Sequence, residues 1–360
     1  MLVNGYLVIE GSTYRITQTV DCLQAQSTIP LVLDYLAEGN ANVVYRVIPF
    51  GRATDCPIPP NVVGTALRLS KNKDFITPSE QRAHELKHVL SFLPQEYIIP
   101  QTLVKVDRDI IDAINRNLLA IAQSGRRTAL RHGDTVSSDD GHGLLMTDMT
   151  ATGTETVLEF KPKWLAQSPT APGNAVRCRT CALRAQRQAA IKAGQIKPKG
   201  TAWCPLAMVS GNDMQRHNAA EAILEANGCD WIEDGVGRLA RLLATSPLLG
   251  LLRDHQTRLD AQGVLQLSNE AKDLDDLRVA MTLRDCTLFV RTRNGRFDES
   301  SDMRLADLDL KAGHPEKIAK WAAIERSLVD QGWYANQETN AEPETICVLS
   351  RDAKIQWCKT

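Results

Sequence analysis

A change in the spacing of apolar residues near residue 148 constrains the fold of this 360-residue chain most strongly. Before it, short β-branched or alternating runs are separated by Gly and Pro, which predicts the strands of a twisted sheet. The runs are Leu31–Leu33, Asn42–Ile48 and Val62–Leu69. One clear helix is predicted from Thr77, which starts a Thr-Pro-Ser-Glu capping box, to about Leu93, and a second over 107–124.

After Gly153 the pattern becomes mixed. We expect strands at Glu155–Lys161, Asp285–Arg293 and Leu305–Lys311, and helices around Cys178, over 215–252 and over 315–331, with a basic linker over 191–200. A single hydrophobic core rarely grows to this length. The sequence therefore predicts an α+β fold with two lobes, a β-rich N-lobe over 1–148 and a larger mixed C-lobe over 149–360.

The charge balance excludes some classes of protein. There are 42 Lys and Arg against 43 Asp and Glu, so the chain lacks the basic field of a sequence-specific nucleic-acid binder, and any anion site must be local. The sequence has no apolar run of membrane-spanning length and no secretory signal, and its nine cysteines are odd in number. We expect a monomer in the cytoplasm or nucleus, with no membrane partner.

Asp307-Leu-Asp-Leu-Lys311 alternates charged and apolar residues. In a strand, Asp307, Asp309 and Lys311 would share one face. Two carboxylates suit Mg²⁺, which binds through one or two carboxylates and substrate phosphates, and the lysine could hold a phosphate. The alternative is an ordinary solvated edge strand.

Two further strands repeat this pattern. In Glu159-Phe-Lys-Pro-Lys163, the acid and both lysines (Lys161 and Lys163) would share a face, and Pro162 favours a sheet edge or strand end. Asp285 precedes a largely apolar strand, where a carboxylate could act as general base toward a hydroxyl. A surface face and a capped strand end remain the alternatives.

Residues 38–44, Glu-Gly-Asn-Ala-Asn-Val-Val, predict a small-residue turn between two strands. Such a turn lets backbone amides approach a phosphate. Gly and Asn are equally typical of an ordinary hairpin.

His84-Glu-Leu-Lys-His88 matches the HExxH pattern of zinc peptidases. The apolar stripe of its helix runs through Leu86, Val89, Leu90 and Leu93, which predicts that both histidines face solvent. We therefore keep the zinc peptidase only as an alternative.

Cys178-Arg-Thr-Cys181 has the spacing of a structural zinc site, and Cys204 supplies a third thiol. His217 is the best candidate for the fourth ligand and Cys229 the next. Reduced thiols without a metal are the alternative.

Eight segments in this order resemble the inositol-pentakisphosphate 2-kinase family. They are Glu38–Asn42, Arg68, Met146–Met149, Glu159–Lys163, Cys178–Cys181, Cys204–Gly211, Asp285–Phe289 and Asp307–Lys311. The resemblance implies a bilobal fold distantly similar to protein kinases, with ATP and Mg²⁺ as cosubstrates. It also implies transfer of the γ-phosphoryl group to the 2-hydroxyl of inositol pentakisphosphate, which would give inositol hexakisphosphate (phytic acid).

The resemblance also implies residue roles. Asp285 would be the base, and Asp307 with Asp309 would hold Mg²⁺. The ATP-binding residues would be Glu38, Gly39, Asn40, Asn42, Arg68, Asp148, Glu159, Arg253 and Asp307. The inositol phosphate would contact Arg131, Lys161, Lys163, Arg187, Lys311, Lys317 and Trp321.

The sequence departs from the family pattern in places. Leu130 stands where an aromatic residue usually precedes the substrate arginine, and an expected Asn is missing near Leu249. The spacing after Lys311 is longer by about two residues, which affects the placement of Lys317 and Trp321. A non-catalytic protein that binds inositol phosphates or other polyanions is the second hypothesis, although such a protein gains nothing from carboxylates in its pocket.

Overall fold

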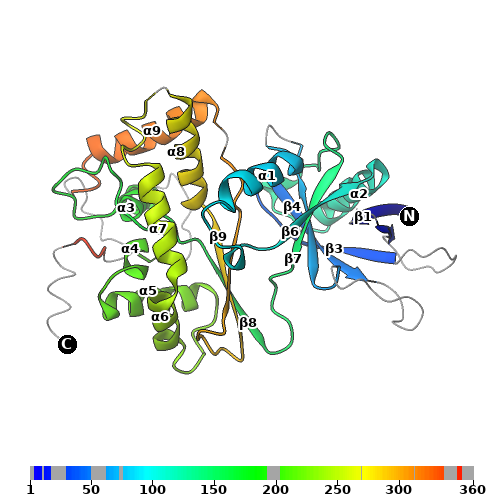
Figure 1. The fold of residues 1–360 in the computed structure, drawn as a ribbon, viewed down its shortest axis with the longest axis horizontal. Coiled ribbons are helices and arrows are strands. Elements are labelled where there is room, and N and C mark those ends of the chain that lie inside the picture. Colours follow the sequence, from blue (N-terminus) through cyan, green and yellow to red (C-terminus); the bar gives the residue numbers. More distant parts are fainter. Residues whose placement is uncertain are drawn as a thin grey trace. The chain divides into compact units, whose positions relative to one another are not determined.

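The chain forms two compact units in the computed structural model, which describes residues 4–9, 12–17, 30–49, 62–72, 76–192, 203–268, 270–311, 313–335 and 347–350 (Figure 1). Unit 1 comprises Met1–Gln95 and Ile99–Asp148, and unit 2 comprises Glu96–Ile98 and Met149–Thr360. Helices and sheets are both abundant, which confirms the α+β class.

Unit 1 is built on a closed barrel with the strand order β1-β2-β3-β4-β5-β7-β6. Its strands are β1 (Asn4–Ile9), β2 (Ser12–Thr17), β3 (Pro30–Glu38), β4 (Asn42–Pro49), β5 (Thr65–Ser70), β6 (Gln101–Val106) and β7 (His142–Thr147). All neighbouring pairs are antiparallel except β2 with β3. The three predicted strands of this region correspond to β3, β4 and β5.

The two predicted helices of unit 1 are present, and the first has an unexpected end. At α1 (Pro78–His84) the capping box forms as predicted, with the Thr77 hydroxyl accepting from the Glu80 amide and the Glu80 carboxylate accepting from the Thr77 amide. A π-helical turn, Glu85–Val89, then replaces the α-helix that was predicted to reach Leu93. The second helix is α2 (Arg108–Gln123).

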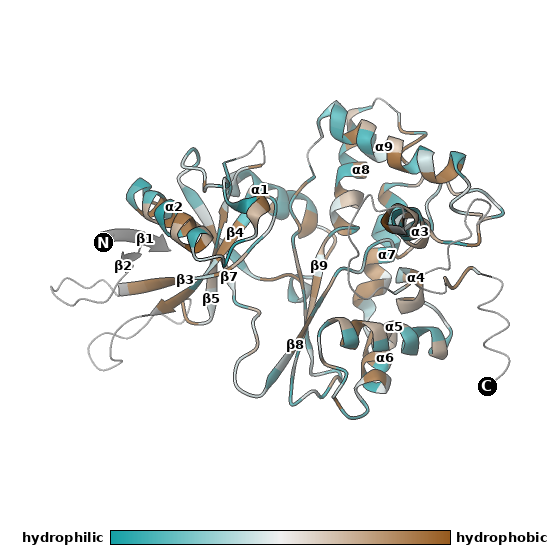
Figure 2. Cartoon of the chain, turned by 180° about the vertical axis from the view of Figure 1, so that it is seen from behind, coloured by the Kyte–Doolittle hydropathy of each residue, from teal (hydrophilic) through white to brown (hydrophobic). Residues whose placement is uncertain are grey.

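The core of unit 1 lies between the barrel and α2. Apolar residues of α2, including Ile110, Ile114 and Leu118, pack with Tyr45 and Leu67 of the barrel. Figure 2 shows apolar and polar residues alternating around α2, as expected for a helix with one buried face.

Unit 2 contains a three-stranded antiparallel sheet with the order β10-β9-β8. The strands are β8 (Glu155–Phe160), β9 (Thr287–Arg293) and β10 (Asp302–Ala306). Cys286, Leu288 and Val290 are fully buried, as the alternating pattern predicted.

Helices make up most of the rest of unit 2 (Figure 1). They are α3 (Arg179–Lys192), α4 (Pro205–Met208), α5 (Asp213–Ala226), α6 (Gly235–Thr245), α7 (Pro247–Leu259), α8 (Ala271–Leu283) and α9 (Pro315–Asp330). The helical region predicted over 215–252 is not continuous but is divided among α5, α6 and α7. Gly228, with φ +63°, follows the end of α5, and Ser246 with Pro247 starts α7 as N-cap and first helical residue.

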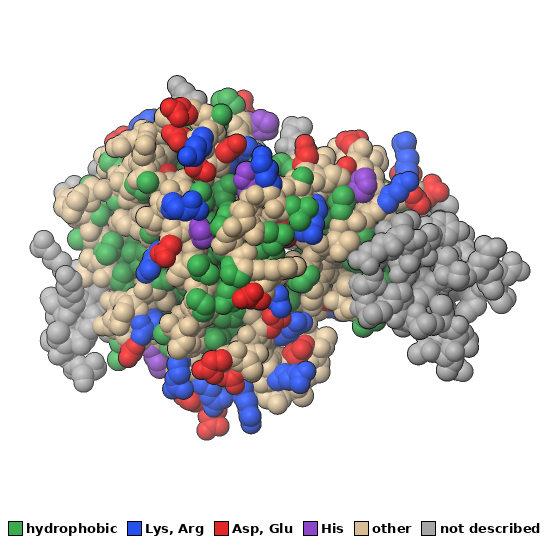
Figure 3. Space-filling model, in the orientation of Figure 1, with side chains coloured by type: hydrophobic (Ala, Val, Ile, Leu, Met, Phe, Trp, Pro, Cys, Tyr) green, Lys and Arg blue, Asp and Glu red, His purple; other side chains and the backbone are tan. Residues whose placement is uncertain are grey.

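Lys and Arg side chains alternate with Asp and Glu over the described surface drawn in Figure 3, so no large field of one sign covers that face. In the part of the chain that the structure describes, no helix is both long enough and apolar enough to cross a bilayer.

Candidate active site

Three chain segments meet at one end of the unit 2 sheet, where β8 and β10 finish and β9 begins. In the antiparallel register, Phe160 at the end of β8 pairs with Leu288 of β9, and Ala306 at the end of β10 pairs with Thr287. The residues after β8, before β9 and after β10 are therefore neighbours. These segments carry the charged side chains that the sequence singled out.

Asp285 lies among Lys161, Lys163 and Lys311, which we call the lysine cluster. Its Oδ1 lies 2.9 Å from Nζ of Lys163, and its Oδ2 lies 2.8 Å from Nζ of Lys311. Nζ of Lys161 lies 3.7 Å from Oδ1 and donates to the backbone carbonyl of Asp285 at 2.6 Å. Burial alone would raise the pKa of Asp285, but Lys311 and Lys163 together hold it well below its usual range. Asp285 is therefore an ionised carboxylate at neutral pH.

The turn after β8 has an unusual backbone. Lys163 has φ +61°, a left-handed conformation that costs a non-glycine residue about 1–2 kcal/mol. Gln256 of α7 holds this turn, because its amide donates to the Lys163 carbonyl and accepts from the Leu165 amide, both at 2.9 Å. Gln256 was not among the residues predicted from the sequence. It continues the buried i, i+4 stripe of Leu248 and Leu252 and is fully buried, which is the signal that could have revealed it.

The backbone around Lys311 is held by α8. The Thr282 hydroxyl donates to the Asp309 carbonyl at 3.0 Å and accepts from the Lys311 amide at 3.2 Å. Nε of Arg278 donates to the Lys311 carbonyl at 2.8 Å. Two residues of α8 thus fix the segment that carries Lys311 toward Asp285.

Residues 307–311 do not continue β10, so the predicted strand over Leu305–Lys311 was wrong beyond Ala306. The reason is Asp307, whose φ of +55° lies outside the range of a strand. The strand predicted over Glu155–Lys161 likewise ends at Phe160, two residues before Pro162, in agreement with the predicted strand end. The charged residues converge through these turns instead of through a shared strand face.

Asp307 provides carboxylate oxygens beside the lysine cluster. Its Oδ2 accepts from the Thr287 hydroxyl at 2.7 Å and lies 3.4 Å from Nζ of Lys161. Burial and the nearby charge of Asp307 raise the pKa of Glu159. Two carboxylates that repel one another in this way form a favourable environment for a divalent cation.

Lys317 lies close to this group. Burial and the positive charge of Lys311 lower its pKa, and its Nζ lies 5.9 Å from the ring centroid of the buried Trp321 on the same helix, α9. Arg187 is on an exposed part of α3. Arg253 of α7 is paired with its neighbour Asp254 at 3.2 Å and lines a small cavity of about 160 Å³.

In unit 1, the turn after β3 stands on a buried ionic network. Nζ of Lys71 lies 2.6 Å from Glu38 and 3.0 Å from Asp134, and Arg127 donates to both oxygens of Glu38 at 2.8 and 2.9 Å. Burial opposes the ionisation of Glu38, yet its hydrogen bonds with Arg127 and Lys71 lower its pKa to about 2. Lys71 also donates to the Gly39 carbonyl at 2.8 Å, so the network fixes the turn itself.

The remaining predicted residues of unit 1 lie on or near the barrel. Arg131 donates to Asn40 at 2.8 Å, which connects it to the turn. Asn42 accepts a hydrogen bond from Ser70 at 3.4 Å. Arg68 is buried in β5, and Asp148 accepts from Arg46 at 2.7 Å. A Cβ added at Gly39 would meet nothing within 4 Å, so the turn has open space beside it.

The cysteine pair Cys178 and Cys181 lies beside the predicted third thiol, Cys204, and beside a fourth cysteine that was not predicted, Cys347. The sulfurs of Cys178, Cys181, Cys204 and Cys347 all lie within 4.8 Å of one another, and all four residues are buried. His217, the predicted fourth ligand, is not part of this group, and Cys347 lies there instead. Cys229 is also outside the group and donates to the Asn227 carbonyl.

The HExxH histidines are placed differently from the prediction. His84 is buried, whereas Leu86 is 54% exposed, because the π-helical turn shifts the helical phase that the prediction assumed. The imidazoles of His84 and His88 stack at 5.0 Å, and Glu85 is paired with Arg82. Within the described residues, the four cysteines are the only group of three or more potential ligands close enough to share a metal. The zinc peptidase reading therefore has no third ligand there.

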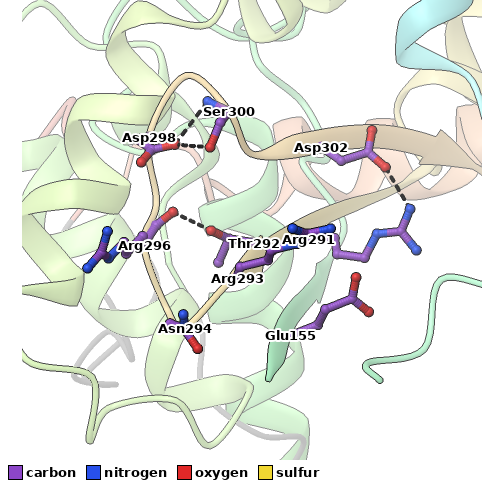
Figure 4. A pocket seen from close by; sticks show the side chains of 9 residues that line it. All are labelled: Glu155, Arg291, Thr292, Arg293, Asn294, Arg296, Asp298, Ser300 and Asp302. Carbon is purple, nitrogen blue, oxygen red and sulfur yellow. Dashed lines mark hydrogen bonds and ion pairs between the residues drawn. The ribbon is translucent and has the colours of Figure 1, made fainter. Parts of the chain in front are cut away.

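A cavity of about 590 Å³ lies at the other end of the unit 2 sheet, where Glu155 of β8 pairs with Arg293 of β9. Figure 4 shows the residues that line it. Its arginines alternate with acidic residues, and Arg291 is paired with Asp302 at 2.9 Å. Such matched charges do not favour a polyanion, in contrast to the lysine cluster.

Comparison with known proteins agrees with the resemblance. The sequence model described as inositol-pentakisphosphate 2-kinase matches residues 35–327. A protein of Yarrowia lipolytica (strain CLIB 122 / E 150) named inositol-pentakisphosphate 2-kinase is 33% identical over 183 residues. That stretch covers 51% of this chain and 55% of the relative. Since the family model spans most of its length, the chain belongs to the inositol-pentakisphosphate 2-kinase family.

Proposed function

We propose that this chain transfers the γ-phosphoryl group of ATP to the 2-hydroxyl of inositol pentakisphosphate, giving inositol hexakisphosphate. The observation that carries the proposal is the lysine cluster around Asp285. It combines a carboxylate that can accept a proton with three cations that can bind phosphates.

The charge of the substrate explains why the lysines are clustered. Five phosphates carry on the order of eight to ten negative charges near neutral pH. The net charge of the chain is only −1, so attraction has to come from a local site. Lys161, Lys163, Lys311 and the nearby Lys317 supply it within unit 2, and Arg187 and Arg131 are further candidates for phosphate contacts.

Substrate binding would change the basicity of Asp285. In the structure, Lys163 and Lys311 contact its carboxylate and depress its pKa. Phosphates that draw these lysines away would raise that pKa toward its usual value, so Asp285 would become a better proton acceptor once the substrate is in place. The 2-hydroxyl would donate its proton to Asp285 as it attacks the γ-phosphorus.

Asp307 and Asp309 would hold Mg²⁺, with Glu159 beside them. These residues suit the ion because carboxylate oxygens are the protein ligands that Mg²⁺ takes alongside phosphates. A cation would also relieve the mutual repulsion of the Asp307 and Glu159 carboxylates. When bound, Mg²⁺ would neutralise charge on the transferred phosphoryl group.

On the nucleotide side, we propose that residues 39–42 contact ATP, with Arg68, Asp148 and Arg253 as further contacts. The open space at Gly39 supports an approach of the phosphates to this turn. Because the Glu38 carboxylate is already occupied by Lys71 and Arg127, its role would be to fix the turn.

The test is to incubate the chain with γ-labelled ATP, Mg²⁺ and inositol pentakisphosphate, and to separate the products. Labelled inositol hexakisphosphate is expected. Binding of inositol pentakisphosphate without any labelled product would contradict the proposal and support the non-catalytic binding protein.

A further inference from the structure

Four cysteines that are far apart in the sequence come together in unit 2, outside the site described above. Cys178 precedes α3, Cys181 lies in its first turn, and Cys204 precedes α4. Cys347 comes from the described segment 347–350, 143 residues after Cys204. All four are buried free thiols. We call them the cysteine cluster.

The spacing of the sulfurs matches a tetrahedral metal site. Sγ of Cys204 lies 3.9 Å from Sγ of Cys178 and 3.8 Å from Sγ of Cys347. In a tetrahedral site with zinc–sulfur bonds of about 2.3 Å, neighbouring sulfurs are about 3.8 Å apart. These two distances match that spacing, and all four sulfurs lie within 4.8 Å of one another.

The surroundings of the cluster suit bound thiolates. Four thiolates around Zn²⁺ carry a net charge of −2, and the buried guanidinium of Arg177 interacts electrostatically with Cys181 and Cys347. The backbone amide of Cys178 donates to Sγ of Cys347 at 3.1 Å. Hydrogen bonds of this kind orient and stabilise metal-bound ligands.

We propose that Cys178, Cys181, Cys204 and Cys347 bind one structural Zn²⁺, which attaches residues 347–350 to the start of α3. Each thiol loses its proton to solvent when its sulfur binds the metal. A closed four-cysteine site leaves no open position for substrate, so the ion stabilises the fold and takes no part in phosphoryl transfer.

The start of α3 also contacts a residue next to the lysine cluster. Arg179, the first residue of α3, pairs with the buried Glu325 at 3.2 Å, and its guanidinium lies 4.5 Å from the ring centroid of Trp164. Trp164 directly follows Lys163. The zinc site would thus fix the start of α3, where Arg179 packs on Trp164. Trp164 is the neighbour of Lys163, a candidate for substrate binding.

The test is metal analysis of the full chain, purified without chelators. One zinc per chain is expected, and Cys347→Ser should weaken zinc binding at least about tenfold. Cys229→Ser is the matched control, since it removes a buried thiol outside the cluster, and His217→Ala removes the ligand that the sequence favoured. Both should retain one zinc. These readouts are independent of kinase activity.

If Cys347→Ser does not fold, the wild-type chain still decides the question. Cobalt substituted for zinc is expected to give the charge-transfer absorption of four thiolates. A spectrum of three thiolates and one nitrogen would overturn the assignment of Cys347. So would a wild-type chain without zinc, or a Cys347→Ser chain that retains zinc as tightly as the wild type.

Discussion

Replacing Asp285 by Asn should lower the rate of phosphoryl transfer and at the same time tighten substrate binding. Asn keeps the size of the side chain but cannot accept the hydroxyl proton, and loss of a general base costs about 10²–10⁴-fold in rate. The carboxylate also competes with phosphates for Lys163 and Lys311, which it contacts at 2.9 and 2.8 Å. Asp285 is 43% exposed, so each ion pair contributes roughly 0.2–1 kcal/mol.

Releasing both lysines should therefore make the binding of inositol pentakisphosphate more favourable by about 1 kcal/mol, which lowers the dissociation constant about fivefold. Single-turnover kinetics would measure the rate, and titration calorimetry without ATP would measure affinity. Asp302→Asn is the matched control, because Asp302 also contacts two basic side chains, Arg291 and Arg304, but lies at the opposite end of the sheet. A rate for Asp285→Asn within about threefold of wild type would contradict the role of Asp285 as base, and a tenfold loss of affinity would contradict its competition with the phosphates.

Three further predictions concern buried charges. Lys71→Met should lower the free energy of unfolding by about 3–5 kcal/mol in urea titrations, because Glu38 and Asp134 lose a fully buried cation; a loss under about 1 kcal/mol would contradict this. The pKa of Glu38, about 2, lies below its unfolded value of about 4.3. The ionised Glu38 carboxylate therefore stabilises the fold fully above about pH 4.5, and this stabilisation is lost as the pH falls toward 2. Melting curves from pH 7 to 2 should show this loss for the wild type and a smaller one for Glu38→Gln; equal losses would count against it. Arg284→Met should lower the free energy of unfolding by about 3–5 kcal/mol at pH 7, because it leaves the Asp260 carboxylate buried without its cation. Adding Asp260→Asn should recover part of that loss. Denaturant titration of both variants would measure the two values.

Local signals in the sequence predicted local structure well. The capping box at Thr77 formed because its hydrogen bonds join residues only three apart. The hairpin between β3 and β4 followed from two β-branched runs around a small-residue turn. The buried side of β9 followed from its alternating pattern.

The misses came from backbone conformations that the residue pattern does not encode. Alternation around Asp307 predicted a strand, but a positive φ at that residue turns the chain. The helical phase at His84 was wrong because a π-helical turn inserts there. In both places, tertiary contacts override the local period.

The candidate site was partly predictable for a related reason. The lysine cluster and Asp285 were identified from short charged motifs, but their contacts depend on turns held by Gln256 and Thr282, which carry no motif. Cys347 lies 143 residues from Cys204, so no local spacing could connect it to the other cysteines.

If the site around Asp285 directs phosphoryl transfer to the 2-hydroxyl of inositol pentakisphosphate, the product must carry its new phosphate on that oxygen. Nuclear magnetic resonance of the product formed from isotopically labelled substrate would locate the new phosphate. The wild-type chain is expected to place it on the 2-oxygen, and Asp285→Asn is expected to form this product at least about 10²-fold more slowly. A new phosphate on another position, or on an existing phosphate group, would contradict this expectation.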